Sequence, residues 1–244
     1  MLNRYYYDLH VHSCLSPCAD DDMTPNNIAG MAAIKGLNIL ALTDHNSCKN
    51  CPSFFAACCR QGIIPVAGME LTTAEDVHIV CLFPTLEAAE EFDEEIQKFR
   101  TLYKNRADIF GDQLIMGEND EAKGTEEYLL INATTLDLSS AYELASRYGA
   151  AVFPAHIDRD ENGIIAMLGG FPDEPRFPCI ELRSNEKKEE YIKNYDLGKK
   201  LILTDSDAHR LWEINEAENF IMLEDEPYSS ALIRERLISL ITGK

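Results

Sequence analysis

Six histidines are the residues of this 244-residue sequence best suited to catalysis or metal binding. Each lies at or next to the end of a predicted strand: His10, His12, His45, His78, His156 and His209. Imidazole is the commonest protein ligand for Zn, Fe and Mn, and alternate residues of a strand point to the same side. His10 and His12 could therefore hold one metal ion between them.

Carboxylates accompany these histidines, either beside them in sequence or at a strand end: Asp44, Glu70 and Asp207. A mixed set of imidazole and carboxylate groups suits divalent metals such as Mn, Fe or Zn. A single histidine could instead be a core residue bonded to a backbone carbonyl. Six histidines and three carboxylates together predict a metal site.

The elements that must position these groups follow an α/β pattern. Short apolar runs rich in β-branched residues alternate with helix-like stretches, which is typical of parallel strands joined by crossover helices. We predict eight strands at residues 5–11, 38–43, 63–69, 77–83, 150–154, 179–183, 201–204 and 220–223. Eight strands allow a barrel, in which the carboxyl ends of the strands meet at one mouth.

Thr24 and Pro25 read as the cap and first residue of a helix over residues 25–35. Residues 86–149 are long for one crossover, so we predict an insertion in a single domain over residues 1–244. It would contain a helix, a β-hairpin of residues 114–119 and 127–132, and a helix over 139–148 capped by Asp137 or Ser139. It could be a lid over the mouth or, more commonly, a packed decoration.

Six short motifs resemble those of the PHP (polymerase and histidinol phosphatase) superfamily of metal-dependent phosphoesterases. They are DLHVHS (8–13), ALTDHN (41–46), GME (68–70), VHI (77–79), AH (155–156) and TDSDAH (204–209). The resemblance implies a distorted (β/α)7-type PHP barrel with a metal site at the C-terminal mouth of the strands. It also implies up to three divalent ions per chain, of Mn, Fe or Zn.

The resemblance further implies a ligand set. The first ion would be held by His10, His12, Glu70 and Asp207, and Glu70 would bridge to a second ion held by His78 and His156. The third would be held by His45, His209 and an Asp of the loop 13–24, which is longer here than the commoner Ser-Asp-Gly pattern. Counting back from the helix start favours Asp20, with Asp21 and Asp22 as alternatives. Asp44 would orient a ligand rather than bind metal.

Three divalent ions and three ligand carboxylates leave a cationic pocket in a chain of formal charge −20, and such a pocket attracts a small phosphate. Paired metals lower the pKa of bound water, so the predicted nucleophile is a metal-activated hydroxide. His45, His209 and Glu70 are the predicted catalytic residues, with either histidine or a bound water assisting the leaving group. Arg159 and Arg183 are predicted to bind the phosphate.

These observations predict a phosphatase acting on a small phosphomonoester. The resemblance implies a nucleotide, a nucleoside bisphosphate or histidinol phosphate as its substrate class. The alternatives are a non-catalytic metal-binding or partner-binding PHP module and a metal-dependent amidohydrolase. The acidic charge disfavours long nucleic acid. The lack of a long apolar run disfavours a membrane span, and we expect a cytoplasmic location. The oligomeric state is left open.

The eight cysteines suggest reduced thiols rather than a disulfide framework. Cys48 and Cys51 form a single CxxC, which could serve a metal or redox chemistry. Buried thiols without a role are the favoured interpretation of this pair. Cys14 and Cys18, in the loop after the HxH motif, are better placed to lie near the metals.

Overall fold

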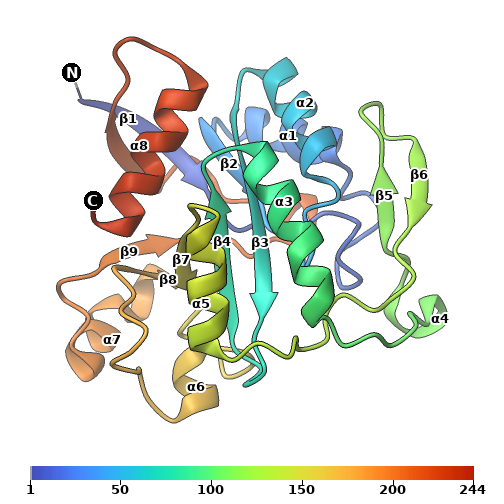
Figure 1. Ribbon diagram of the computed structural model, residues 1–244. Helices are drawn as coiled ribbons and strands as arrows, with labels where there is room; N and C mark the ends of the chain where they lie inside the picture. The colour runs from blue at the N-terminus through green and yellow to red at the C-terminus, as the bar shows by residue number, and fades with distance from the viewer. Residues whose placement is uncertain (1) are drawn as a thin grey trace.

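The computed structural model describes residues 2–244, apart from the side chain of Lys187. Its main feature is a curled, half-barrel sheet of six strands in the order β10-β1-β2-β3-β4-β7 (Figure 1). These strands are β1 (Leu2–Asp8), β2 (Ile39–Leu42), β3 (Ile64–Thr72), β4 (His78–Phe83), β7 (Ala151–Pro154) and β10 (Phe220–Glu224). The α/β fold predicted from the sequence is confirmed.

A second, parallel pair of strands continues the curve beside β7: β8 (Cys179–Leu182) and β9 (Leu201–Thr204). The end of β9 returns to β1. Leu9 donates its N–H to Asp205 at 2.6 Å, and Val11 forms a bridge with Ala208. The carboxyl ends of β1 and β9 are therefore brought together.

The strand directions explain how His78 reaches the mouth from the beginning of its strand. β1, β2 and β3 are parallel, whereas β4 is antiparallel to both β3 and β7. His78 is paired with Thr72, near the carboxyl end of β3. The start of β4 thus lies at the same edge of the sheet as the ends of its neighbours.

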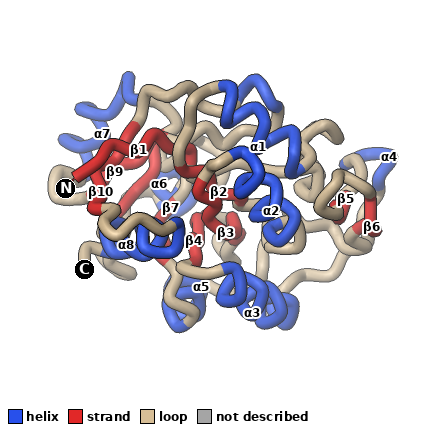
Figure 2. The backbone as a smooth tube through the Cα atoms, turned by 90° about the horizontal axis from the view of Figure 1, so that it is seen from above, coloured by secondary structure: helices blue, strands red, loops and turns tan. Residues whose placement is uncertain are grey.

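Helices surround the sheet, as Figure 2 shows. They are α1 (Pro25–Ile34), α2 (Cys51–Gln61), α3 (Leu86–Ile96), α4 (Ala107–Phe110), α5 (Leu138–Arg147), α6 (Ile164–Leu168), α7 (Lys188–Tyr195) and α8 (Ser230–Thr242). Short 3-10 helices cover Gln97–Phe99, Asn185–Lys187 and Leu211–Glu213.

The sheet is buried on both faces, so there are two apolar cores. Helices α1, α2, α3 and α5 pack on the outer face, where Phe54 and Phe92 are fully buried. The inner face, including Tyr7 and Phe153, packs against α8 through Leu237 and its neighbours. A strand covered on both sides is expected to be apolar along its whole length, and every residue of β3 is buried. Among them, Glu70 is the charged exception.

Two predicted helix starts are confirmed. The Thr24 side chain accepts from the N–H of Asn27 and caps α1, with Pro25 as the first helical residue. The side chain of Asp137, rather than Ser139, accepts from the N–H of Ser140 and caps α5. In each case a side-chain oxygen satisfies a backbone donor that the first helical turn leaves free.

The predicted hairpin is right in its first strand and wrong in its second. β5 (Leu114–Met116) pairs with β6 (Ala122–Thr125), not with residues 127–132. The turn is tight, because Gly117 donates its N–H to the carbonyl of Glu121. Residues 127–132 instead run toward the mouth, where the Asn46 side chain donates to the carbonyl of Leu130 at 2.6 Å.

Candidate metal centre

The six histidines meet at the mouth of the half-barrel. His10 and His12 follow β1, His45 follows β2, His78 begins β4, His156 follows β7 and His209 follows β9. A cavity of about 260 Å³ opens there. It is lined by Cys18, His45, Glu70, His78, Ile131, Arg159, Asn162, Asp207 and His209.

Glu70 lies at the centre of the cluster and is almost completely buried. Five imidazole nitrogens lie within 3.3 Å of its carboxylate oxygens. Oε1 is 2.8 Å from His78 Nδ1, 3.0 Å from His156 Nε2 and 3.3 Å from His10 Nε2. Oε2 is 2.9 Å from His45 Nδ1 and 3.3 Å from His12 Nε2. One carboxylate thus connects five of the histidines.

Three groups of side chains place their ligand atoms within 4.8 Å of one another. They are His10, His12, Glu70 and Asp207; His45, Glu70 and His78; and His12, His45 and His209. The first group has the same members as the ligand set implied for the first ion. His156 belongs to none of the three groups, although its Nε2 contacts Glu70 Oε1.

Unsatisfied buried atoms show that these residues fit divalent cations. His45 Nδ1, His156 Nδ1, Glu70 Oε2 and Asp207 Oδ1 are buried without a hydrogen-bond partner of suitable geometry. His10 Nε2 and His12 Nε2 face each other at 3.2 Å. Buried polar atoms without partners are costly, and a bound cation would satisfy several of them at once. The donor set of imidazoles and carboxylates is the one that Zn, Fe and Mn accept.

The electrostatics of the cluster divide the histidines into two kinds. Burial lowers the pKa of His78 to about 4, and burial together with His12 lowers that of His209 to about 3. Both rings are therefore neutral at pH 7. Burial also lowers the pKa of His45, but the neighbouring Cys18 and Glu70 side chains outweigh it and raise the value to about 9.

The carboxylates stay ionised despite their burial. Burial raises the pKa of Glu70, but His78, His10 and His45 hold it well below its ordinary value. Burial likewise raises the pKa of Asp207, and His10 and His12 bring it far below the usual range. Negative charge is thus fixed at the bottom of the cavity, where a cation would be attracted.

Glu181 of β8 supports the cluster from behind, and the sequence analysis missed it. Its Oε2 lies 2.9 Å from His10 Nδ1, and its Oε1 accepts the His156 N–H at 2.9 Å. A carboxylate bonded to the far nitrogen of a ligand histidine fixes the ring and its tautomer. The available signal was an acidic residue inside an otherwise apolar strand, where burial without a partner would be costly.

Asp44 acts through two serines rather than on a histidine directly. It accepts hydrogen bonds from Ser13 N, Ser13 Oγ and Ser16 Oγ at 2.6–2.7 Å. Ser16 Oγ in turn lies 3.0 Å from His12 Nδ1 and accepts the His45 N–H at 3.2 Å. This chain of contacts holds two of the clustered histidines in place, in line with the orienting role expected of Asp44.

Left-handed backbone conformations occur at the mouth. His156 has φ +27°, Asp207 has φ +52° and Asn46 has φ +48°. Such angles are uncommon for residues other than glycine and store local strain. After His156, a Cβ at Gly163 would lie 2.4 Å from the carbonyl of Arg159. The loop that carries both His156 and Arg159 therefore requires glycine at that position.

The two predicted phosphate-binding arginines differ in position. Arg159 lines the cavity, and its Nη1 donates to Asp207 Oδ2 at 2.7 Å. Arg183 is exposed, follows the last residue of β8 and does not line the cavity. Because its side chain lies outside the site, a phosphate-binding role for Arg183 has no support in the structure.

Asp20 also lies apart from the three candidate ligand groups. Its N–H donates to the His209 carbonyl at 3.0 Å, but its carboxylate is 43% exposed and faces Arg210 Nε at 3.5 Å. Asp21 and Asp22 are exposed. The residue of this loop that lines the cavity is Cys18. Loop length alone could not predict this, because hydrogen bonds of the loop backbone decide which side chain faces inward.

Residues 8–107 match the family described as the PHP domain. The match covers less than half of the 244-residue chain. The resemblance predicted from the motifs is confirmed over these residues, and the clustered side chains of the site can hold divalent metal. A 5'-3' exoribonuclease of Haemophilus influenzae is 31% identical over 116 residues, which are 44% of this chain and 39% of that protein.

Solved structures share the fold at lower identity. A lesion-specific endonuclease Q from Pyrococcus furiosus is 20% identical with a TM-score of 0.65, over 99% of this chain and 56% of that one. A candidate metal-dependent phosphoesterase from Bifidobacterium adolescentis is 17% identical with a TM-score of 0.57, over 95% of each chain. The chain therefore spans about half of the endonuclease, and its match covers less than half of the exoribonuclease.

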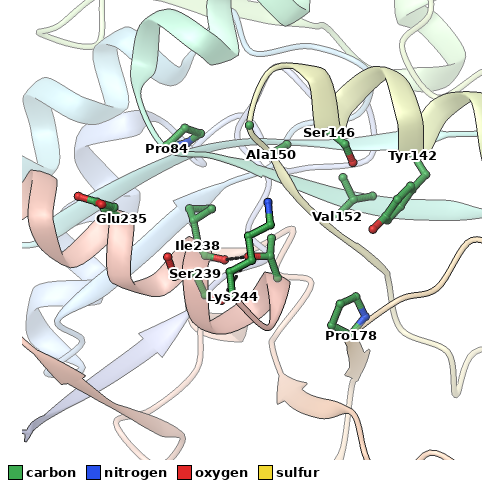
Figure 3. Close-up of a pocket in the computed structure, with 12 residues that line it drawn as sticks. Pro84, Tyr142, Ser146, Ala150, Val152, Pro178, Glu235, Ile238, Ser239 and Lys244 are labelled. Carbon is green, nitrogen blue, oxygen red and sulfur yellow. Dashed lines mark hydrogen bonds between the residues drawn. The ribbon is translucent and has the colours of Figure 1, made fainter.

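A second cavity of about 260 Å³, shown in Figure 3, is lined by none of the six histidines. Its walls come from α5, the start of β7 and α8, and include Tyr142, Val152 and Ile238. None of the candidate ligand groups found among the described residues lies there. The mouth is therefore the candidate site. No helix in residues 2–244 is long and apolar enough to span a membrane.

Proposed function

We propose that this protein is a metal-dependent phosphatase of the PHP family that hydrolyses a small phosphomonoester of the nucleotide, nucleoside bisphosphate or histidinol phosphate class. The observation that carries the proposal is the buried Glu70, surrounded by five imidazoles, in a small cavity that Arg159 borders. The Glu70 and Asp207 carboxylates at the bottom of the cavity suit divalent ions, and Arg159 suits a phosphate bound next to those ions.

The proposed ligands are distributed over three ions. His10, His12, Glu70 and Asp207 would hold the first, Glu70 with His78 and His156 the second, and His45 with His209 the third. When bound, such ions lower the pKa of water and neutralise the negative charge of a phosphate. Glu181 and Asp44 position ligand histidines, and both are buried.

Arg159 would bind the phosphate, and Asp207 would orient the Arg159 side chain. The Arg159 side chain is 32% exposed, and its Nη1 donates to Asp207 Oδ2. The remaining donors can grip two phosphate oxygens, which lysine cannot do with the same geometry. His45 and His209 also line the cavity and are placed to assist the departing oxygen.

Arg159→Gln should therefore raise KM for the substrate more than it lowers stability. Arg183→Gln is the matched control, because the same change is made at an exposed arginine outside the cavity. Steady-state kinetics with thermal melts compare the two variants. Unchanged kinetics in Arg159→Gln would assign this arginine to structure alone.

A nuclease activity is the second candidate, because two of the matched proteins are named as a nuclease. The formal charge of −20 opposes binding of long polyanions but not entry of one phosphorylated end. Assays with a mononucleotide and with a short 5′-phosphorylated RNA distinguish the phosphatase from the nuclease: a phosphatase releases phosphate from the mononucleotide, whereas a nuclease shortens the RNA.

The decisive experiment measures phosphate release from nucleotides, nucleoside bisphosphates, histidinol phosphate, sugar phosphates and that RNA. The protein is loaded separately with Mn, Fe(II) or Zn, and chelator-treated protein is the control. We expect chelator-sensitive release from one small-substrate class and none from the His10→Ala/His12→Ala variant. Hydrolysis of amides or lactones instead would favour an amidohydrolase. No reaction by metal-loaded protein would favour a non-catalytic module.

A further inference from the structure

We propose that strand β10 is an interface between two copies of this chain, which pair along it in antiparallel fashion about a two-fold axis at Met222. The inference is independent of the proposed function. β10 is the end strand of the six-stranded sheet, and within the described residues it pairs with β1 alone. Figure 2 shows it at one side of the molecule, near the N-terminus. The free edge of an end strand is a row of backbone groups to which another strand can add.

The backbone groups of every second residue of β10 face this free edge. Tyr7 donates its N–H to the Asn219 carbonyl at 3.3 Å, which makes these two residues a hydrogen-bonded pair of the β1–β10 ladder. Such pairs alternate along an antiparallel ladder. Phe220, Met222 and Glu224 have the other positions, so their N–H and C=O groups point away from β1. No group of residues 2–244 forms a hydrogen bond with them.

This edge lacks the features that usually keep sheet edges apart. The sequence of β10 is FIMLE, without Pro or Lys, and its register with β1 has no bulge. Apolar side chains on the adjoining face are exposed: Phe220 and Met222 are each 43% exposed, and Leu2 of β1 is 58% exposed. An uncovered edge of this kind promotes pairing with another strand.

The charged side chains of the same face identify a second copy as the partner. The Arg4 guanidinium lies over the Phe220 ring, 4.1 Å from its centroid. Arg4 and Glu224 are both exposed, and neither forms an ion pair with a described side chain. When the two Met222 residues are opposite each other, Phe220 is opposite the partner's Glu224. Opposite side chains have their Cβ atoms about 4.5–5.5 Å apart, so the guanidinium over Phe220 can pair with that carboxylate.

The free backbone groups match in the same register. Met222 pairs with its own copy, and Phe220 pairs with the partner's Glu224 on each side of the axis. Each of these pairs can exchange two N–H···O bonds. A shift of one residue would turn the backbone groups away from each other, and a shift of two would separate Glu224 from the partner's Phe220. The register at Met222 therefore satisfies both the backbone and the charges.

Sedimentation velocity of the whole chain at rising protein concentration tests the pairing. Because the formal charge of −20 opposes association, the buffer contains about 0.15 M salt, which largely screens charges more than about 8 Å apart. We expect a species of twice the 27.5 kDa of one chain. Met222→Lys places two ammonium groups at the axis and should weaken the dimer about 5- to 10-fold. Met167→Lys is the matched control, since Met167 is 40% exposed but lies on α6.

Exchange of the two charges tests the register. Arg4→Glu and Glu224→Arg should each weaken the dimer about 3- to 10-fold, and the double variant should dimerise like the wild type. Thermal melts show that the variants fold. Amide hydrogen exchange in residues 218–226 should slow as the wild-type dimer forms. A monomer at every concentration, a dimer unaffected by Met222→Lys, or unchanged amide exchange on dimerisation would overturn the proposal. A double variant no better than either single variant would overturn the register at Met222.

Discussion

The carboxylate of Glu181 offers a sharp test of how the metal centre is held together. It serves two donors at once, His10 Nδ1 at 2.9 Å and the His156 N–H at 2.9 Å. Glu181→Gln keeps the size and shape of the side chain but has one acceptor oxygen instead of two. One of the two donors must then face an NH₂ group, so either the His10 tautomer changes or the His156 backbone loses its partner.

The expected loss follows from these contacts. A hydrogen bond to a charged group contributes about 1.5–3 kcal/mol, and about 1.4 kcal/mol corresponds to a tenfold change in an equilibrium constant. We therefore expect Glu181→Gln to bind Zn about 10- to 100-fold more weakly than the wild type. The loss should be in affinity, because every proposed ligand is still present.

The assay is a competition titration of metal-free protein against a chromophoric chelator at pH 7, with thermal melts to show that the variants fold. Glu189→Gln makes the same chemical change at an exposed position of α7 and should bind Zn like the wild type. Wild-type affinity in a folded Glu181→Gln protein would refute the positioning role. If that variant does not fold, Glu181→Asp retains the charge and tests the geometry alone.

Three further predictions concern stability. Gly68→Ala should lower the free energy of unfolding by about 1–3 kcal/mol, because a Cβ there would lie 2.8 Å from the nearest neighbouring side-chain atom. Gly30→Ala, which has nothing within 4 Å, should show no loss in the same urea titration. Treatment with EDTA should lower Tm, and Zn should restore it, because the unpartnered buried atoms of the site are satisfied only in the metal-bound state; an unchanged Tm would argue against a metal centre. Burial raises the pKa of Glu126, but Lys49 and Arg100 outweigh it and hold the pKa below its ordinary value of 4.5. The ionised carboxylate therefore stabilises the fold above that value and loses its contribution as pH falls through the folded-state pKa. Glu126→Gln should cost stability at pH 7 and less in acid, and urea midpoints that differ equally at both pH values would contradict the reasoning.

The sequence allowed those residues of the site to be predicted that lie at the ends of strands. His10, Glu70 and His156 are close together because their strands end at one edge, and alternation and apolar runs locate such ends. The direction of β4 was not predictable in this way. Its antiparallel course depends on pairing with β3 and β7, yet it brings His78 to within 2.8 Å of Glu70.

The parts that could not be predicted depend on tertiary contacts. Glu181 acts across two elements, and no spacing rule connects it to His10, which is 171 positions away. The loop after His12 is irregular, so counting residues favoured Asp20 whereas the backbone bonds turn Cys18 inward. The second hairpin strand was misplaced because a tight turn at Gly117 shortens the connection.

The balance of charge at the mouth explains why this fold should depend on cations. Six imidazoles are gathered around two buried carboxylates, Glu70 and Asp207. If every ring were protonated, positive charge would exceed negative charge in a buried space, and burial already lowers the pKa of His78 and His209. His10 Nε2 and His12 Nε2 lie only 3.2 Å apart, so two neutral rings with facing lone pairs and two protonated rings would both be unfavourable there. A metal ion removes this conflict by accepting the lone pairs while pairing with the carboxylates. The free energy of metal binding is thereby coupled to the stability of the strand ends that carry the ligands.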